Sequence, residues 1–260
     1  MHPPTGTRSR PRDPASAGAW QRGGGRPYLG RMIPERFRRL RTVLQRRQPD
    51  LTVVMDQVNK PHNFSAILRS CDATGVLDAH AVPPAEGLDL SPVTSAGSEK
   101  WIRVHRHPDV QAALKAVKSQ GFRVVAAHPA ESAGDYRDMD FTRPTALLLG
   151  AELHGVSPEG LAGADDIVAI PMVGMVRSLN VSVAAALLLF EAQRQRESAG
   201  LYEVSRLPED VFDSRLFEWA YPKLASRYRH AGIPYPRLDA DGAILDPIPG
   251  TVGYLEASSD

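Results

Sequence analysis

From Leu51 onward, short apolar runs alternate along the chain with segments whose apolar residues recur every three or four positions. The runs are typical of buried strands, and the recurring positions are typical of amphipathic helices. Their alternation predicts a parallel α/β sheet with helices on both faces. We expect strands over 51–56, 79–82, 101–105, 122–128, 145–149 and 166–170, and helices over 63–74, 108–120, 157–163 and 180–198.

Helical segments flank this α/β region on both sides. Pro34 suits the first position of a helix, and Phe37, Leu40 and Leu44 would share one face of it. The segment 208–230 predicts a further helix, which its central proline would break. The chain therefore divides into a disordered basic tail over 1–31, a basic helix over 32–50, an α/β body over 51–200, and a C-terminal helical extension and tail over 201–260.

Charge is distributed unevenly, although the formal net charge is only +1. Residues 1–50 hold 12 arginines and 3 acidic residues and so carry +9, while the other 210 residues hold 19 basic and 27 acidic residues and carry −8. Residues 1–31 have too little aliphatic content to offset their ordering entropy, so we expect disorder there. The tail is either a solvated segment without a role or a polycationic arm that attracts nucleic acid.

Composition excludes several classes of protein. The single cysteine, Cys71, cannot form an internal disulfide or a zinc-type cluster, so we expect a reducing cytoplasm and no metal. The longest apolar run, Val181 to Phe190, is much shorter than the roughly 20 residues of a membrane span. The N-terminus is rich in arginine and lacks the apolar region of a secretory signal.

The first candidate motif, NKPHNFSAILRSCDATGV, directly follows the expected strand 51–56. Loops that follow parallel strands are where ligands gather in α/β proteins. Asn63 would serve as an N-cap, and Gly75 would end the helix. Arg69 lies six residues after Asn63, so the spacing leaves open whether both face one site or Arg69 is a surface residue.

The second motif, LLLGAELHGVSPE, is again a strand followed by a loop with glycine. Gly150 allows a ligand to approach the backbone closely. Glu152 is either a polar contact in that site or an exposed loop acid. Ser157 and Pro158 predict the N-cap and first residue of the next helix. The loop lacks GxGxxG and GK[ST], so it supports neither a dinucleotide oxidoreductase nor a P-loop.

The third motif is IPMVGMVRSLNVSVAAALLLFEAQRQR. Asn180 can cap the helix that follows, and capping alone could also explain Ser178. The run from Val181 to Phe190 favours core or a dimer interface. Arg194 and Arg196 complement the negative end of this helix.

Together the three motifs closely resemble the SpoU family of AdoMet-dependent RNA 2′-O-ribose methyltransferases, within the SPOUT superfamily. The resemblance covers about residues 35–236, and RRQPDLTV, KPHN and NVSVA are most similar to the TrmH subgroup, which methylates guanosine 18 in the tRNA D-loop. It implies a deep C-terminal trefoil knot, AdoMet binding by residues 51–200, an obligate homodimer with the active site near its interface, and tRNA as partner. The alternative within the family is a sibling enzyme for rRNA or another tRNA position.

The resemblance also implies roles for individual residues. Its catalytic positions match Arg69, Asn63, Glu152, Ser178 and Asn180, an intact set that argues against a catalytically silent RNA-binding module. Its AdoMet pocket matches Ala127, where relatives place threonine, and Gly150, Ile170, Met175 and Leu179. Its RNA-binding surface matches Arg39, Arg47, His62, Lys118, Arg194 and Arg196.

The reaction that the resemblance implies constrains the role of Arg69. The ribose 2′-OH must lie in line with the methyl group and must lose its proton as it attacks. The family assigns this step to the arginine that matches Arg69, but a guanidinium with a pKa above about 12 is a poor base. We therefore expect Arg69 to orient the 2′-OH and stabilise the developing oxyanion, with the substrate phosphate taking part in proton removal.

Overall fold

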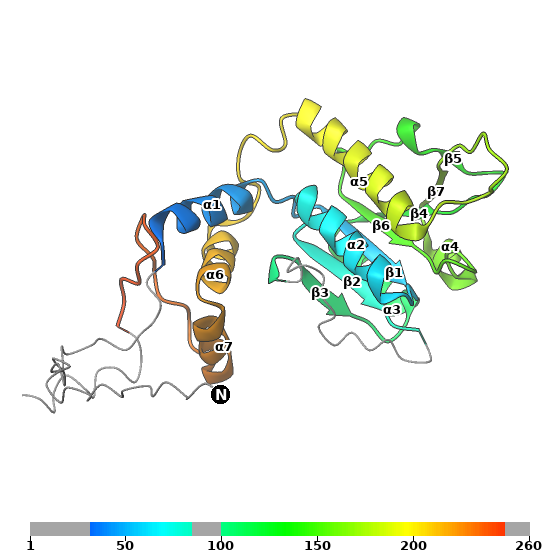
Figure 1. Cartoon of the computed structure of the whole chain (residues 1–260). Helices are drawn as coiled ribbons and strands as arrows, with labels where there is room; N and C mark the ends of the chain where they lie inside the picture. The colour runs from blue at the N-terminus through cyan, green and yellow to red at the C-terminus, as the bar shows by residue number, and fades with distance from the viewer. Residues whose placement is uncertain (1–31, 85–99, 248–260) are drawn as a thin grey trace, which may run out of the picture. The chain divides into compact units, whose positions relative to one another are not determined.

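The computed structural model describes residues 32–84 and 100–247 (Figure 1). The predicted tail over 1–31 and the end of the predicted C-terminal tail, 248–260, lie outside the described residues. The strands are β1 (Leu51–Asp56), β2 (Asp78–Val82), β3 (Arg103–Arg106), β4 (Arg123–Ala127), β5 (Gly134–Asp135), β6 (Thr145–Leu149) and β7 (Asp166–Ala169). The helices are α1 (Pro34–Gln45), α2 (Pro61–Ala73), α3 (Val110–Ser119), the 3₁₀ turn η2 (Tyr136–Asp138), α4 (Pro158–Gly163), α5 (Val181–Ser198), α6 (Glu209–Ala220) and α7 (Pro222–Ala231).

The described strands form one seven-stranded sheet in the order β3-β2-β1-β6-β4-β7-β5, and all its pairings are parallel. The predicted parallel α/β sheet with flanking helices is therefore confirmed. All the expected strands and helices are present, and their ends differ from the predicted ends by two residues at most. The short β5 and η2 were not predicted, because two or three residues are too few to show a period.

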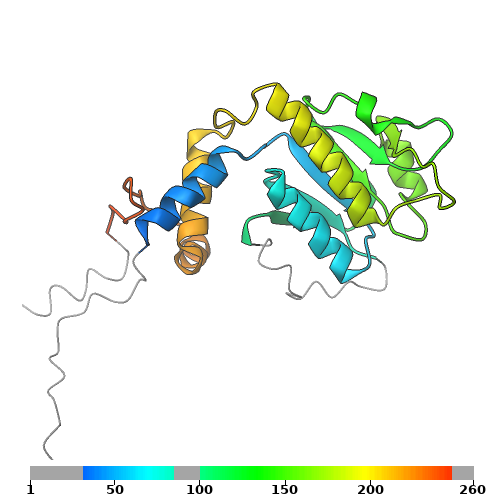
Figure 2. The same ribbon diagram turned by 45° about the horizontal axis from the view of Figure 1, so that its top comes forward.

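The core lies on both faces of the sheet. In β6, Leu147 packs in the cluster that α2 and α5 cover, whereas Leu148 packs in the cluster that α3 covers. Figures 1 and 2 both show α2 and α5 side by side on one face. Successive residues of a strand point to opposite faces, so a central strand buried on both sides is apolar throughout.

The flanking helices build a core of their own. In α1, Phe37, Leu40 and Leu44 are buried, as the predicted amphipathic face requires, and they pack with Leu216 and Trp219 of α6. The predicted helix over 208–230 is broken at its proline, as expected: α6 ends at Ala220 and α7 begins at Pro222. No helix in the described ranges, 32–84 and 100–247, is both long and apolar enough to cross a membrane.

Most of the predicted helix ends are confirmed, with one correction at α2. Ser157 caps α4 and Asn180 caps α5 through their side-chain oxygens, and Gly75, with a φ of 84°, follows α2. Asn63 is not an N-cap, because α2 already begins at Pro61. Proline suits the first helical position, so it starts the helix earlier and leaves the amide of Asn63 free for other contacts.

Candidate active site

A cavity of about 280 Å³ lies among the loops that follow β4, β6 and β7. Of the five residues predicted to hold AdoMet, Ala127, Gly150, Ile170 and Leu179 line this cavity. Met175 does not line it, and its side chain is fully exposed, so within one chain the structure does not place this residue in the cavity wall. Its neighbours Val173 and Val176 are exposed as well, which shows that this part of the loop turns away from the cavity.

Backbone forms much of the cavity wall beyond β6. Ala151 and Gly155 exchange backbone hydrogen bonds of 2.9 and 2.8 Å, which bring Gly155 against Gly150. A Cβ atom on Gly150 would lie 2.0 Å from the carbonyl carbon of Gly155, so only glycine fits there. Beside it, Nδ1 of His128 is buried without a hydrogen-bond partner among the described residues. An apolar cavity with bare backbone edges and an unpaired polar atom fits a nucleoside-type cofactor.

Three side chains from the three motifs meet beside this cavity. Asn63 of α2 donates a hydrogen bond to Oε1 of Glu152. Asn180 donates to the same oxygen at 2.9 Å and to Oδ1 of Asn63 at 3.1 Å. We call Asn63, Glu152 and Asn180 the amide–carboxylate cluster. Segments far apart in sequence thus form one polar site at the carboxyl ends of the strands, where α/β proteins bind ligands.

Lys60 adds a charge to this cluster that the sequence analysis missed. Its ammonium group forms an ion pair with Glu152. Hydrogen bonds from Lys60 and then Asn63 hold the pKa of Glu152 below its usual range, so this carboxylate is ionised at neutral pH. Lys60 stands in the motif NKPHN, and its position directly before the proline that starts α2 is the signal that could have placed it near the loop.

The other two predicted catalytic residues lie differently. Ser178 lines the cavity and is exposed. Arg69 is exposed on α2, but its side chain makes no hydrogen bond or ion pair with any residue that the structure describes. Six residues along a helix turn the chain by about 240° around its axis, so Arg69 and Asn63 leave α2 in different directions. Within one chain, the structure does not bring Arg69 to the amide–carboxylate cluster.

Two of the predicted RNA-binding arginines are buried, and that prediction is wrong for both. Arg47 is 1% exposed, donates to the carbonyl of Val76 at 2.8 Å and pairs with Asp72. Its guanidinium lies 5.1 Å from the centre of the Trp219 ring. Burial lowers the pKa of Arg47, despite the opposing effect of Asp72. A guanidinium enclosed in this way cannot reach a phosphate.

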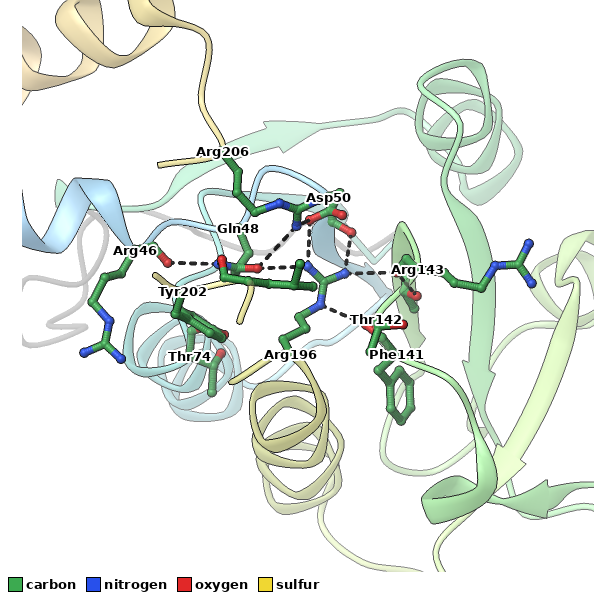
Figure 3. A network of polar contacts seen from close by, with 12 residues as sticks. Arg46, Gln48, Asp50, Thr74, Phe141, Thr142, Arg143, Arg196, Tyr202 and Arg206 are labelled. Atoms are coloured by element: carbon green, nitrogen blue, oxygen red, sulfur yellow. Dashed lines mark hydrogen bonds and ion pairs between the residues drawn. The ribbon is translucent and has the colours of Figure 1, made fainter. Parts of the chain in front are cut away.

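Arg196, at the end of α5, is the second correction (Figure 3). Arg196 is 0% exposed. It donates to Oδ1 of Asp50 at 2.6 Å, to Oε1 of Gln48 at 3.1 Å, and to the carbonyls of Phe141 and Arg143 at 2.8 and 2.9 Å. All these acceptors belong to the chain itself, so the guanidinium fixes the fold and does not contact RNA.

Asp50 completes this arrangement, which we call the Arg196 hub (Arg196, Asp50, Gln48 and Arg206). Its Oδ1 also accepts a hydrogen bond from Arg206 at 2.6 Å. Burial raises the pKa of Asp50, but the hydrogen bonds from Arg206 and Arg196 together lower it below its ordinary value. The hub therefore joins the entry to β1, the end of α5 and the segment before α6 (Figure 3).

The remaining residues predicted to bind RNA lie at the surface. Arg39 and His62 are exposed. Lys118 pairs with Asp165 at 2.6 Å, and its side chain is 39% exposed. Arg194 pairs with Glu191 at 2.7 Å, and its side chain is 65% exposed. Surface ion pairs of this kind exchange partners at little cost, so these cations stay available to an anion.

Comparison with known proteins agrees with this geometry. The family model described as the SpoU rRNA Methylase family matches residues 50–190. The chain belongs to the SpoU family. A second SpoU model, for the C-terminal part of these rRNA methylases, matches residues 194–247. The resemblance seen in the motifs is thus confirmed.

Individual SpoU relatives cover most of the chain. The tRNA (guanosine(18)-2′-O)-methyltransferase of Escherichia coli K12 is 48% identical over 215 residues, which are 82% of this chain and 94% of the relative. The protein of the same name from Thermus thermophilus is 55% identical over 184 residues, 71% of this chain and 95% of the relative.

Solved SpoU structures share the fold. The crystal structure of the Aquifex aeolicus TrmH/SpoU tRNA modifying enzyme has a TM-score of 0.68 at 43% identity, covering 72% of this chain and 96% of that chain. The SpoU methyltransferase AviRb from Streptomyces viridochromogenes, in complex with the cofactor AdoMet, has a TM-score of 0.53 at 30% identity, covering 59% of each chain.

Proposed function

We propose that this chain is a tRNA (guanosine(18)-2′-O)-methyltransferase, which transfers the methyl group of AdoMet to the ribose 2′-OH of guanosine 18 in the D-loop. The observation that carries the proposal is the meeting of Asn63, Glu152 and Asn180 beside the 280 Å³ cavity, in a chain similar to enzymes of that name. We assign the activity to residues 51–200 and place the enzyme in the cytoplasm, with its tRNA substrate.

AdoMet is the cofactor of this proposal, and it supplies an electrophilic methyl group on a sulfonium. Ala127, Gly150, Ile170 and Leu179 would hold it in the cavity that they line. The bare backbone at Gly150 and the unpaired Nδ1 of His128 support the fit. No group of His, Cys, Asp or Glu side chains in the described part of the chain is arranged to hold a metal ion, and the proposed reaction requires none.

The amide–carboxylate cluster orients the nucleotide in this proposal. Glu152 is ionised and already holds the amides of Asn63 and Asn180, so the cluster presents fixed dipoles to an incoming ribose. Such preorganised groups act on the transition state without reorganising. Arg69 stabilises the developing oxyanion. Because Arg69 lies outside the cluster in one chain, the proposal requires that a second copy bring its Arg69 to the site.

That second copy belongs to a homodimer, which we propose forms through α5. Val183, Leu187 and Phe190 are spaced to share one face of this helix, and their residues are 46%, 39% and 51% exposed. An exposed apolar face of this kind is typical of a subunit interface. Phe190→Glu should give monomers in sedimentation and lose nearly all activity, because a charge cannot be buried there. A monomeric wild-type chain would contradict the interface.

We also propose that the segment from β6 to α5 forms the deep trefoil knot of the SpoU fold. The strand after β6 in this segment, β7, pairs with β4 and not with β6. The loops after β4, β6 and β7 all border the same cavity, as a knotted cofactor site requires. A crystal structure of the chain tests this directly, because its backbone either threads through a loop in this segment or does not.

For tRNA binding, we propose a surface on α1. Its exposed arginines are Arg36, Arg38, Arg39 and Arg41, and within the described ranges none of these side chains forms an ion pair. Unpaired guanidinium groups on one helix release counterions from a phosphate backbone, so tRNA affinity should fall steeply with salt. Folded tRNA would be recognised mainly through its shape and an exposed loop.

Mapping the methylated nucleotide tests the proposed function. The full chain is incubated with labelled AdoMet and an unmodified tRNA transcript, and the 2′-O-methyl group is located by its resistance to alkaline hydrolysis. The label should appear at guanosine 18, and a transcript lacking the 2′-OH at that position should accept none. Label at another tRNA position, or in rRNA only, would identify the sibling SpoU enzyme instead.

A further inference from the structure

Arg177 is a charged residue of the cavity. It lies within the third motif, but the sequence analysis gave it no role. It lies between β7 and α5, directly before Ser178, and both residues line the 280 Å³ cavity. Its side chain is exposed. It makes no hydrogen bond or ion pair with any residue in the described ranges, so its guanidinium is free to take a ligand from outside the chain.

The charges around the cavity indicate that a ligand of the Arg177 guanidinium would be an anion. Glu152 and Arg177 are the lining residues with permanent charges. Lys60 pairs with Glu152 and offsets its charge. No such partner in the described part of the chain offsets Arg177, in contrast to Arg194, which pairs with Glu191 at 2.7 Å. A free guanidinium presents a planar set of donors that fits the oxygens of a phosphate or carboxylate.

Position decides between these two anions. The interior of the cavity is lined by buried residues such as Val168 and Leu188, whereas Arg177 is exposed at its edge. Arg177 is also next to Ser178 and three residues from Asn180, on the side where the reacting ribose would lie. In RNA, the 2′-OH stands beside the 3′-phosphate of the same nucleotide. A cation at this edge therefore faces the RNA backbone.

We propose that Arg177 binds a backbone phosphate of the substrate RNA beside the target ribose and so positions the 2′-OH for transfer. This inference rests on the proposed function, because it requires an RNA substrate at this cavity. It adds to that function a contact at the site itself, separate from the arginines of α1.

The test compares Arg177→Gln and Arg177→Lys in the full chain. RNA affinity is measured over a salt series, and AdoMet affinity is measured by calorimetry without RNA. Arg177→Gln should lower the slope of log affinity against log salt by about one and raise KM for RNA about tenfold, with AdoMet affinity unchanged. Arg177→Lys should keep the slope but lose part of kcat, because lysine keeps the charge and loses the planar fork.

Arg143→Gln is the matched control, since Arg143 is exposed, lies outside the cavity wall and forms no ion pair among the described residues. Its variant should keep the wild-type slope. Two results together would assign the guanidinium to the cofactor and overturn the proposal. Arg177→Gln would bind AdoMet more weakly than the wild type does, and both proteins would bind an AdoMet analogue without the carboxylate with equal affinity. An unchanged slope and unchanged AdoMet affinity would overturn it as well. Both measurements use whichever RNA the mapping experiment identifies, so failure at guanosine 18 is detected separately.

Discussion

The two ends of α5 carry polar clusters of opposite character. At its first turn, Asn180 is exposed and shares Glu152 with Asn63 beside the cavity. At its last turn, Arg196 is fully buried, and its guanidinium is enclosed by acceptors of the chain (Figure 3). Both ends bear residue types that commonly bind substrates. The difference lies in what surrounds them.

A polar group can serve a ligand only while some of its hydrogen-bonding capacity faces solvent. The amide–carboxylate cluster opens from the buried Asn63 to the exposed Asn180, so it can receive a substrate. In the Arg196 hub, the buried guanidinium of Arg196 already donates hydrogen bonds to acceptors of the chain itself. An unpaired polar group buried there would destabilise the fold. Burial therefore separates a binding site from a structural joint better than residue type does.

The largest expected effect is on stability at the closed end. Arg196→Met removes a buried cation and leaves the acceptors of the hub short of a donor, so the free energy of unfolding should fall by about 3 kcal/mol or more. Arg194→Gln, two residues earlier and exposed, should change it by less than about 0.5 kcal/mol. Urea unfolding measures both. If Arg196→Met kept full stability and lost only RNA affinity, the contrast between the two ends would fail.

The next effect is on activity at the open end. Asn180→Ala removes two hydrogen bonds of the cluster and should lower kcat about a hundredfold. It also removes an N-cap, which costs about 1 kcal/mol of stability. Ser157→Ala is the matched control, because Ser157 caps α4 in the same way. It should cost similar stability and leave kcat nearly unchanged; equal losses of kcat would reduce Asn180 to a capping residue.

The smallest effect is a difference in acid response. The pKa values of Asp50 and Glu152 are both lowered in the folded chain. Unfolded Asp50 takes up a proton at higher pH than folded Asp50, so the stability from its ionised form is present above the unfolded pKa and is lost as pH falls through the folded pKa. Asp50→Asn should flatten this acid decline in unfolding experiments. Glu152→Gln should leave most of the decline in place and lower activity, since solvent reaches the ion pair through Lys60, whose side chain is 52% exposed, and screens it.

The sheet could be predicted in detail where burial is complete. The ends of β1 and β6 match the prediction, because both strands are buried on both faces and appear as continuous apolar runs. The start of α2 was misplaced at Asn63, because two start signals compete there and proline at the first helical position prevails over an asparagine two residues later.

The site could be predicted only in part, because sequence does not reveal burial. Motif resemblance grouped Asn63, Glu152 and Asn180 as catalytic positions, and the structure joins these three side chains by hydrogen bonds. It placed Arg47 and Arg196 on the RNA surface, since an arginine enclosed by distant parts of the chain has the same local pattern as an exposed one. The ion pair from Lys60 depends on a loop about ninety residues away and has no periodic signal.

The sequence positions of the Arg196 hub residues determine when, during translation, their hydrogen bonds can form. Asp50 precedes Arg196 by 146 residues, which at about 5–20 residues per second corresponds to roughly 7 to 30 s of translation. During this time β1 has emerged, but the carboxylate at its entry lacks both of its guanidinium partners, Arg196 and Arg206. The Arg196 hub can therefore form completely only after the end of α5 and the segment beyond it have left the ribosome, and a chain truncated before Arg206 would lack one of the two guanidinium partners of Asp50.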